Sequence, residues 1–140
     1  MRRNYLKYKT VYAVDFDGTL CEDEFPGIGH ERLNTIYFVR RHIQEEGDKW
    51  ILWTVREGER LKEALEWLEK RGLHPDAVND NLPELIEMYG NNPRKVAADY
   101  YIEDRALFYR KRTDKDFECT LNRTMEKCHD ALFEIIREVL

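Results

Sequence analysis

The sequence has few features that would place the protein in a membrane or outside the cell. Only three of its 140 residues are cysteine (Cys21, Cys119 and Cys128), too few and too scattered for a disulfide framework. No apolar run approaches the roughly 20 residues that a membrane-spanning helix needs, and the basic start lacks the apolar segment of a signal peptide. We therefore expect a cytoplasmic protein with no membrane partner.

Positive charge is not in excess either. The formal net charge is −5, which gives the chain no general attraction to nucleic acid. A basic stretch, Arg110-Lys111-Arg112, leaves a nucleic-acid partner open without indicating one. With 42% apolar and 36% charged residues, the composition is typical of a globular protein, and the length suits a single domain over residues 1–140.

The pattern of apolar residues predicts alternating strands and helices. Strands are expected over residues 11–16, 50–55, 75–79 and 96–102, and helices over residues 30–46, 57–71 and 82–89. This order implies an α/β fold with a mainly parallel sheet and helices on both of its faces, a three-layer sandwich. The core is expected over about residues 10–106.

The last part of the chain has a different character. Residues 107–117 are mixed and basic, and residues 120–140 predict a long helix with one apolar face. Packing against the domain is the ordinary interpretation of such a face. The alternatives are a contact between two copies of the chain, which would make a homo-oligomer, or a cover over the site.

The segment Asp15-Phe16-Asp17-Gly18-Thr19-Leu20 is the most informative part of the sequence. It follows an apolar run that predicts a buried strand, so two carboxylates leave the end of a strand together. Gly18 and Thr19 let the backbone turn and present N–H groups. The pattern suits a site for phosphate and a hard cation. Its alternative interpretation is an acidic turn.

Other polar residues follow the neighbouring predicted strands. Thr54 ends the second strand, Glu103 and Asp104 end the fourth, and Lys95 lies just before the fourth. Ligands of open parallel sheets bind at the carboxyl ends of the strands. If the first strand is central, with the second and fourth beside it, these groups converge on one crevice with Asp15 and Asp17.

This set of residues matches the needs of phosphoryl transfer, which are a nucleophile, a proton donor and positive charge on the transferring oxygens. Asp15 can be the nucleophile, and Asp17 can protonate the leaving oxygen and later activate water. The Thr54 hydroxyl can bind phosphate oxygens, and Lys95 would offset charge on phosphate and nucleophile. Several carboxylates would repel one another without a cation among them, and magnesium suits all-oxygen ligands.

The set resembles the four motifs of the haloacid dehalogenase superfamily of phosphotransferases. The motifs are Asp15-Phe16-Asp17-Gly18-Thr19, Trp53-Thr54, Lys95 and Glu103-Asp104, and they fit in order across about residues 10–106. Two stretches, residues 51–58 and 98–105, resemble a small, capless branch of poorly characterised bacterial and phage hydrolases. The resemblance implies a Rossmann-like core, magnesium and an aspartyl-phosphate intermediate on Asp15. Asp17 would be the general acid and base, with its backbone carbonyl on the metal.

Further residues are assigned to this expected site. The metal ligands are Asp15, Asp17 and Asp104, with Glu103 close by as the alternative to Asp104. Phosphate-binding candidates are Phe16, Gly18, Thr19, Val55 and Arg56. Arg56 has an alternative role in an ion pair with Glu59, and Arg94 is the alternative to Lys95 as the inward cation.

The gaps between the motifs bear on the substrate. Neither the gap from Leu20 to Trp50 nor that from Thr54 to Lys95 has room for a cap domain, so we expect an open site. The default substrate is a small phosphorylated metabolite or a nucleotide. The alternatives are phosphates on nucleic-acid ends or on a phosphoprotein, and a binding module that keeps the fold without turnover.

Overall fold

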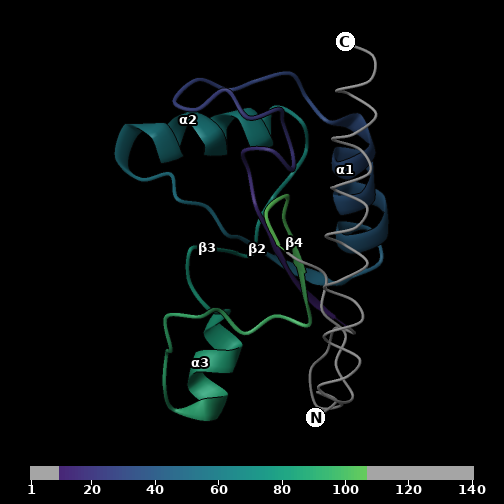
Figure 1. The fold of residues 1–140 in the computed structure, drawn as a ribbon. Coiled ribbons are helices and arrows are strands. Elements are labelled where there is room, and N and C mark those ends of the chain that lie inside the picture. Colours follow the sequence, from purple (N-terminus) through teal and green to yellow (C-terminus); the bar gives the residue numbers. More distant parts are fainter. Residues whose placement is uncertain (1–9, 107–140) are drawn as a thin grey trace, which may run out of the picture. The chain divides into compact units, whose positions relative to one another are not determined.

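A computed structural model describes residues 10–106 of the chain. The chain divides into two compact units, Met1–Asp104 and Arg105–Leu140, and the first is described here (Figure 1). The helix expected over residues 120–140 and the basic stretch before it lie outside the described residues. Within residues 10–106, no helix has the length and apolar character to cross a membrane.

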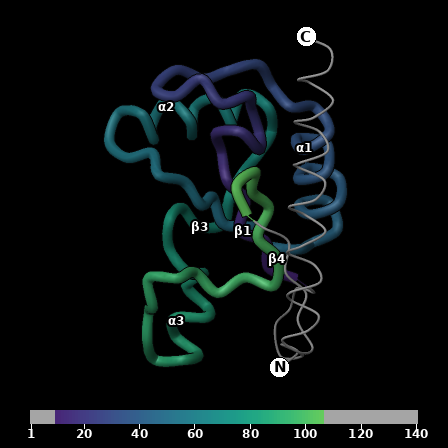
Figure 2. The backbone as a smooth tube through the Cα atoms, viewed as in Figure 1, coloured from purple at the N-terminus to yellow at the C-terminus, as the bar shows by residue number. Residues whose placement is uncertain are grey.

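A four-stranded parallel sheet forms the centre of the first unit. Its strands are β1 (Val11–Val14), β2 (Lys49–Leu52), β3 (Ala77–Val78) and β4 (Tyr100–Ile102). Their order is β3-β2-β1-β4, with every neighbouring pair parallel. The expectation that the first strand lies between the second and the fourth is therefore confirmed. In Figure 2, β1 lies between β3 and β4.

Helices lie on both faces of this sheet. On one face, α1 (Leu33–Phe38), which continues as the π-type helix η1 (Val39–Gln44), packs with α2 (Gly58–Glu69) against Val14 and Leu52. On the other face, α3 (Pro83–Tyr89) packs against Val11 and Ile51. Alternate strand residues enter these two separate cores, as period-two side chains require. The predicted α/β sandwich with three layers is confirmed.

The fourth strand is shorter than the sequence predicts. The prediction covers residues 96–102, whereas β4 contains only Tyr100–Ile102. Side-chain hydrogen bonds replace ladder bonds in the preceding segment, although the N–H of Asp99 still donates to the Val11 carbonyl at 2.7 Å. The backbone N–H of Ala97 donates to the Asn81 side chain at 2.6 Å, and the Asp99 carboxylate accepts from the N–H of Val11 at 2.8 Å.

The first helix also begins later than predicted, at Leu33 instead of His30. The reason is that the residues before it pair with the loop that follows β1. The His30 carbonyl accepts a hydrogen bond from the N–H of Glu22 at 2.7 Å, and Glu31 forms an antiparallel bridge with Cys21. These bonds hold the loop over residues 21–31 against the start of α1.

Candidate phosphoryl-transfer site

The hydrogen-bond ladder of the sheet continues one residue beyond the strands. Three backbone N–H groups make these bonds: Asp15 to the carbonyl of Ile102 at 3.0 Å, Trp53 to Val14 at 2.9 Å, and Asn79 to Leu52 at 2.8 Å. Asp15, Trp53 and Asn79 therefore form one row at the carboxyl edge of the sheet. This edge is where open parallel sheets bind their ligands.

Asp15 is half-buried at the centre of this row. Its pKa is raised to about 6, chiefly because burial disfavours the charged form. A hydrogen bond from the N–H of Phe16 acts in the opposite direction, and the nearby carboxylates of Asp104, Asp17 and Glu103 raise the pKa further. Asp15 therefore lies among negative charges, a position that a cation would stabilise.

Asp104 is the member of the acidic pair that lies against the Asp15 loop. A methyl group on Gly18 would overlap the Asp104 carboxylate. Gly18 also has a φ of +82°, which side chains other than glycine rarely adopt. The charge of Asp104 raises the pKa of Asp15 more than the charge of Glu103 does. Because Gly18 has no side chain, the Asp104 carboxylate has space to lie beside it, near Asp15. This corner of the site therefore holds both carboxylates.

Asp17 has different surroundings. Its two carboxylate oxygens accept hydrogen bonds from Arg56, at 2.8 Å from Nε and at 2.7 Å from Nη2. The Arg56 side chain is fully buried and that of Asp17 is 11% exposed. The pair raises the pKa of Arg56, with the side-chain hydrogen bond to Asp17 as the main cause. Asp17 is thereby held by a cation of the protein itself.

Arg56 has no donor left for a substrate in this arrangement. Its remaining N–H groups donate to backbone carbonyls: Nη1 to Pro26 at 3.3 Å and to Arg60 at 3.4 Å, and Nη2 to Gly27 at 2.6 Å. The guanidinium also lies over the ring of Phe25, 5.2 Å from its centroid. The carboxylate partner of Arg56 is therefore Asp17, and the alternative pair with Glu59 is absent among the described residues. Instead of facing phosphate, Arg56 fastens the loop after β1 to Asp17.

Thr54 lies beside the row, with its hydroxyl oxygen 3.1 Å from the N–H of Arg56 and its own N–H bonded to the Asn79 side chain at 2.8 Å. Val55 is 87% exposed. Gly18 and Thr19 use their N–H groups within the turn, donating to the carbonyls of Cys21 and Phe16. Near Asp15, the N–H of Phe16 is the backbone donor that points to the site.

The two candidate cations differ in their surroundings. The Lys95 ammonium lies 5.5 Å from the centroid of the Tyr101 ring, and no contact between Lys95 and Asp15 is present among the described residues. Arg94 instead lines a cavity together with Trp53 and Asn79. Both residues thus lie on the sheet face that carries α3, to which Asp15 also points by strand alternation.

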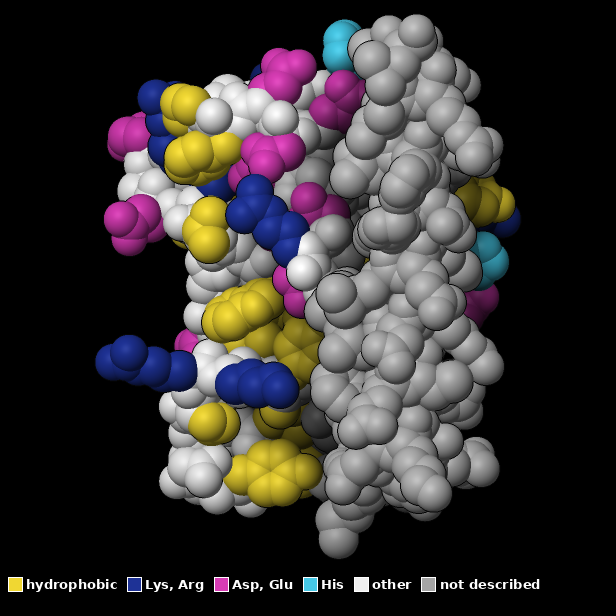
Figure 3. Space-filling model, viewed as in Figure 1, with side chains coloured by type: hydrophobic (Ala, Val, Ile, Leu, Met, Phe, Trp, Pro, Cys, Tyr) yellow, Lys and Arg dark blue, Asp and Glu magenta, His cyan; other side chains and the backbone are white. Residues whose placement is uncertain are grey.

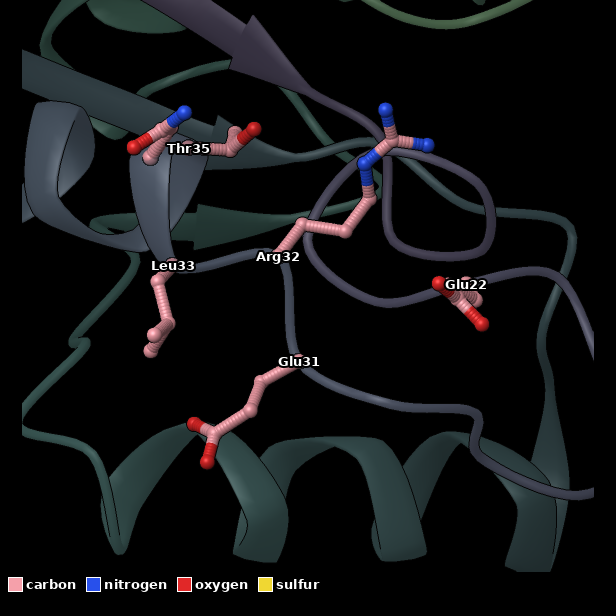
Figure 4. A pocket seen from close by; sticks show the side chains of 6 residues that line it. Glu22, Glu31, Arg32, Leu33 and Thr35 are labelled. Carbon is pink, nitrogen blue, oxygen red and sulfur yellow. The ribbon is translucent and has the colours of Figure 1, made fainter.

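Among the described residues, one cavity lies by the start of α1 and another borders the row, and the sequence pattern predicts neither. The first, of about 440 Å³, lies by the start of α1 and is lined by Glu22, Glu31, Arg32, Leu33, Asn34 and Thr35 (Figure 4). The second, of about 360 Å³, is lined by Trp53, Asn79, Asp80, Asn92, Pro93 and Arg94. Figure 4 shows the Arg32 side chain extended away from Glu31, and its Nη1 donates to the Gly18 carbonyl at 3.0 Å.

A metal site built from three side chains is not present: within residues 10–106, no three His, Cys, Asp or Glu side chains gather as a ligand set. Magnesium commonly takes only one or two carboxylates and completes its shell with water and phosphate. Asp15 and Asp104, which share the corner beside Gly18, meet that smaller requirement. On the face shown in Figure 3, the described Lys and Arg side chains lie in separate groups.

Comparison with known proteins gives one informative relative. No family model matches the chain, and no curated protein matches it. A solved structure, that of a conserved protein coded by a locus of Bacteroides thetaiotaomicron, is 44% identical, with a TM-score of 0.62, and the match covers 70% of this chain and 78% of that one. Sequence identity at this level over most of both chains indicates common ancestry as well as a common fold. The chain therefore belongs to the same family as this conserved Bacteroides protein.

Proposed function

We propose that the protein is a magnesium-dependent phosphatase of the haloacid dehalogenase type, with Asp15 as its nucleophile. One observation carries the proposal. The carboxyl edge of the central strand presents Asp15, half-buried and with its pKa raised to about 6, at a corner shared with Asp104. Thr54 follows the neighbouring strand β2. A desolvated carboxylate next to a second acid, at the ligand-binding edge of a parallel sheet, suits nucleophilic attack on phosphorus.

In the proposed reaction, an Asp15 carboxylate oxygen bonds to phosphorus while the bond from phosphorus to the leaving oxygen breaks. Asp17 gives its proton to that oxygen. Asp17 then takes a proton from water, whose oxygen attacks phosphorus and releases Asp15 and inorganic phosphate. Because Asp17 is paired with Arg56, its carboxyl group must turn away from Arg56 to donate a proton.

Magnesium would be held by the carboxylates of Asp15 and Asp104 and by the Asp17 backbone carbonyl. The ion would supply positive charge to the phosphate oxygens and to the nucleophile. The fit rests on the space left by Gly18, which a side chain would fill, and on oxygen donors of the kind that magnesium prefers. The Thr54 hydroxyl and the N–H of Phe16 would bind phosphate oxygens, and Lys95 would need to move from Tyr101 to reach them.

The test is hydrolysis of 4-nitrophenyl phosphate by the full chain with magnesium. We expect Asp15→Asn to lower kcat by at least about 1,000-fold, as removal of a nucleophile does. Glu69→Gln, an exposed acidic residue of α2, is the matched control and should keep full activity. Unchanged turnover in Asp15→Asn would remove Asp15 from the role of nucleophile.

The same assay separates the alternative substrates. We expect faster release of phosphate from mononucleotides and sugar phosphates than from 5′-phosphorylated oligonucleotides or phosphopeptides. The reverse order would favour phosphorylated macromolecules. Absence of turnover with all of them would favour a binding module that keeps the fold.

A further inference from the structure

The cavity beside Trp53 lies next to Asp15 on the same side of the sheet. Trp53 and Asn79 follow Asp15 in the row at the carboxyl edge, so their backbones lie about 5 Å and about 10 Å from it at ordinary strand spacing. Trp53 packs with the core on the α3 face. Strand alternation directs the Asp15 side chain to this face too, since Val14 and Phe16 enter the opposite core.

The walls of this cavity carry groups for both donating and accepting hydrogen bonds. Asp80 Oδ1 accepts from the N–H of Asn81 at 2.9 Å and from the Asn92 side chain at 2.8 Å, while its second oxygen has no partner among the described residues. Within the same part of the chain, no hydrogen bond or ion pair engages the Arg94 guanidinium. Trp53 adds an apolar ring surface.

A buried asparagine builds the cavity and fastens its two loops together. Asn81 is 4% exposed. Its amide nitrogen donates to the Asn92 side chain at 2.8 Å and to the Pro93 carbonyl at 2.9 Å, and its oxygen accepts from the N–H of Ala97 at 2.6 Å. Asn79, at a φ of 49°, is the one described residue other than glycine with a positive φ. Backbone strain of this kind concentrates at functional sites.

We propose that the cavity binds a sugar ring that carries the phosphate group cleaved at Asp15. This inference rests on the proposed phosphatase function and names its substrate class. A sugar offers hydroxyls that both donate and accept, and ring faces of C–H groups. Asp80 would accept from hydroxyls, Asn79 and Arg94 would donate to them, and Trp53 would contact the ring. A carboxylate on the wall disfavours a second phosphate there. The volume of about 360 Å³ is that of a small-molecule pocket.

The test compares substrates across variants of the full chain. We measure kcat/KM for ribose 5-phosphate, glucose 6-phosphate, uridine monophosphate, glycerol 3-phosphate and 4-nitrophenyl phosphate. The wild type should prefer at least one sugar-containing substrate to glycerol 3-phosphate by about tenfold or more. Asp80→Asn keeps the acceptor for Asn81 and Asn92, and should lower the ratio of sugar phosphate to aryl phosphate by about tenfold. Arg94→Ala should lower the same ratio.

Glu87→Gln, an exposed acidic residue of α3, is the matched control and should leave the ratio unchanged. The free sugar phosphates and the mononucleotide distinguish a free sugar from the ribose of a nucleotide. A ratio that Asp80→Asn does not change would overturn the assignment.

A binding measurement separates this proposal from the phosphatase. Calorimetry on Asp15→Asn should detect the preferred sugar phosphate, and the double variant Asp15→Asn, Asp80→Asn should bind it about tenfold more weakly. Binding without turnover in the wild type would overturn the phosphatase and support the cavity. Turnover of aryl phosphate with no preference for sugar phosphates and no binding of them would support the phosphatase and overturn the assignment of the cavity.

Discussion

The two sides of the candidate site differ in how completely their polar groups are used. On the side of the loop after β1, the buried Arg56 directs its N–H groups to Asp17 and to three backbone carbonyls. On the side of Trp53, Arg94 and one oxygen of Asp80 border an open cavity. A saturated, buried network stabilises one arrangement, whereas polar groups left around a cavity are available for a ligand. We interpret the first side as a support for Asp17 and the second as the place for the substrate.

The largest expected effect comes from removing the Arg56 side chain, whose hydrogen-bond donors are all used. Arg56→Ala leaves Asp17 without its cation and several carbonyls without donors, so we expect a loss of about 3–5 kcal/mol in the free energy of unfolding. Urea denaturation checks it. Arg60→Ala, whose side chain is 50% exposed and pairs with Glu63, is the control and should change stability by no more than about 0.5 kcal/mol. A loss of that small size in Arg56→Ala would mean that the pair with Asp17 is not structural.

A smaller effect is expected where the two sides meet, at Gly18. Gly18→Ala combines backbone strain at a φ of +82° with overlap of the new methyl group and Asp104. Gly47 has nearly the same φ, +80°, and open space around it, so Gly47→Ala measures strain alone. We expect about 1–3 kcal/mol of destabilisation from strain in either variant. Gly18→Ala should lose more stability, and should also lose the rise in melting temperature that we expect magnesium to give the wild type. Equal losses of stability in the two variants would show that the Asp104 side chain moves aside without a cost in free energy.

The smallest effect concerns Asp15 and depends on pH. Its folded pKa of about 6 lies above the ordinary aspartate value of 3.8, so ionisation of Asp15 weakens the folded state as pH rises through about 6. Asparagine cannot ionise. In metal-free buffer, Asp15→Asn should therefore be more stable than the wild type by roughly 1–2 kcal/mol at pH 8, a value reduced for solvent screening. The difference should vanish below about pH 4. Thermal unfolding across pH 4–8 measures it, and a difference independent of pH would contradict the raised pKa.

Sequence reasoning located the chemistry-bearing ends of the strands because apolar runs and the polar residues after them are local signals. Asp15, Thr54 and Asp104 each follow a strand that the structure contains. The boundaries were less accurate where tertiary bonds replaced local ones. Bonds to the side chains of Asn81 and Asp99 shorten β4 at its start, and neither bond has a signal in the strand's own sequence.

The spacing of residues along the sequence predicts neither the hydrogen-bond partners of Arg56 nor the cavity beside Trp53. Arg56 lies two residues after Thr54 and 39 residues from Asp17, and local spacing offered Glu59 as an alternative to a phosphate contact. The cavity depends on the pairing of two asparagine-rich loops, residues 79–81 and 91–93. The sequence predicts a strand up to residue 79, and only the bonds between the two loops give them a common cavity.

The sequence alone determined the alternation of strands and helices, the parallel sheet and the residues that leave its strand ends. These follow from periodicity and turn chemistry, which act over a few residues. Tertiary structure decided which side chains share a site: Asp104 with Asp15 across Gly18, Arg56 with Asp17, and Asn79 with Thr54. The physical reason is that these contacts join distant segments through packing and hydrogen-bond geometry, which the order of residues does not specify.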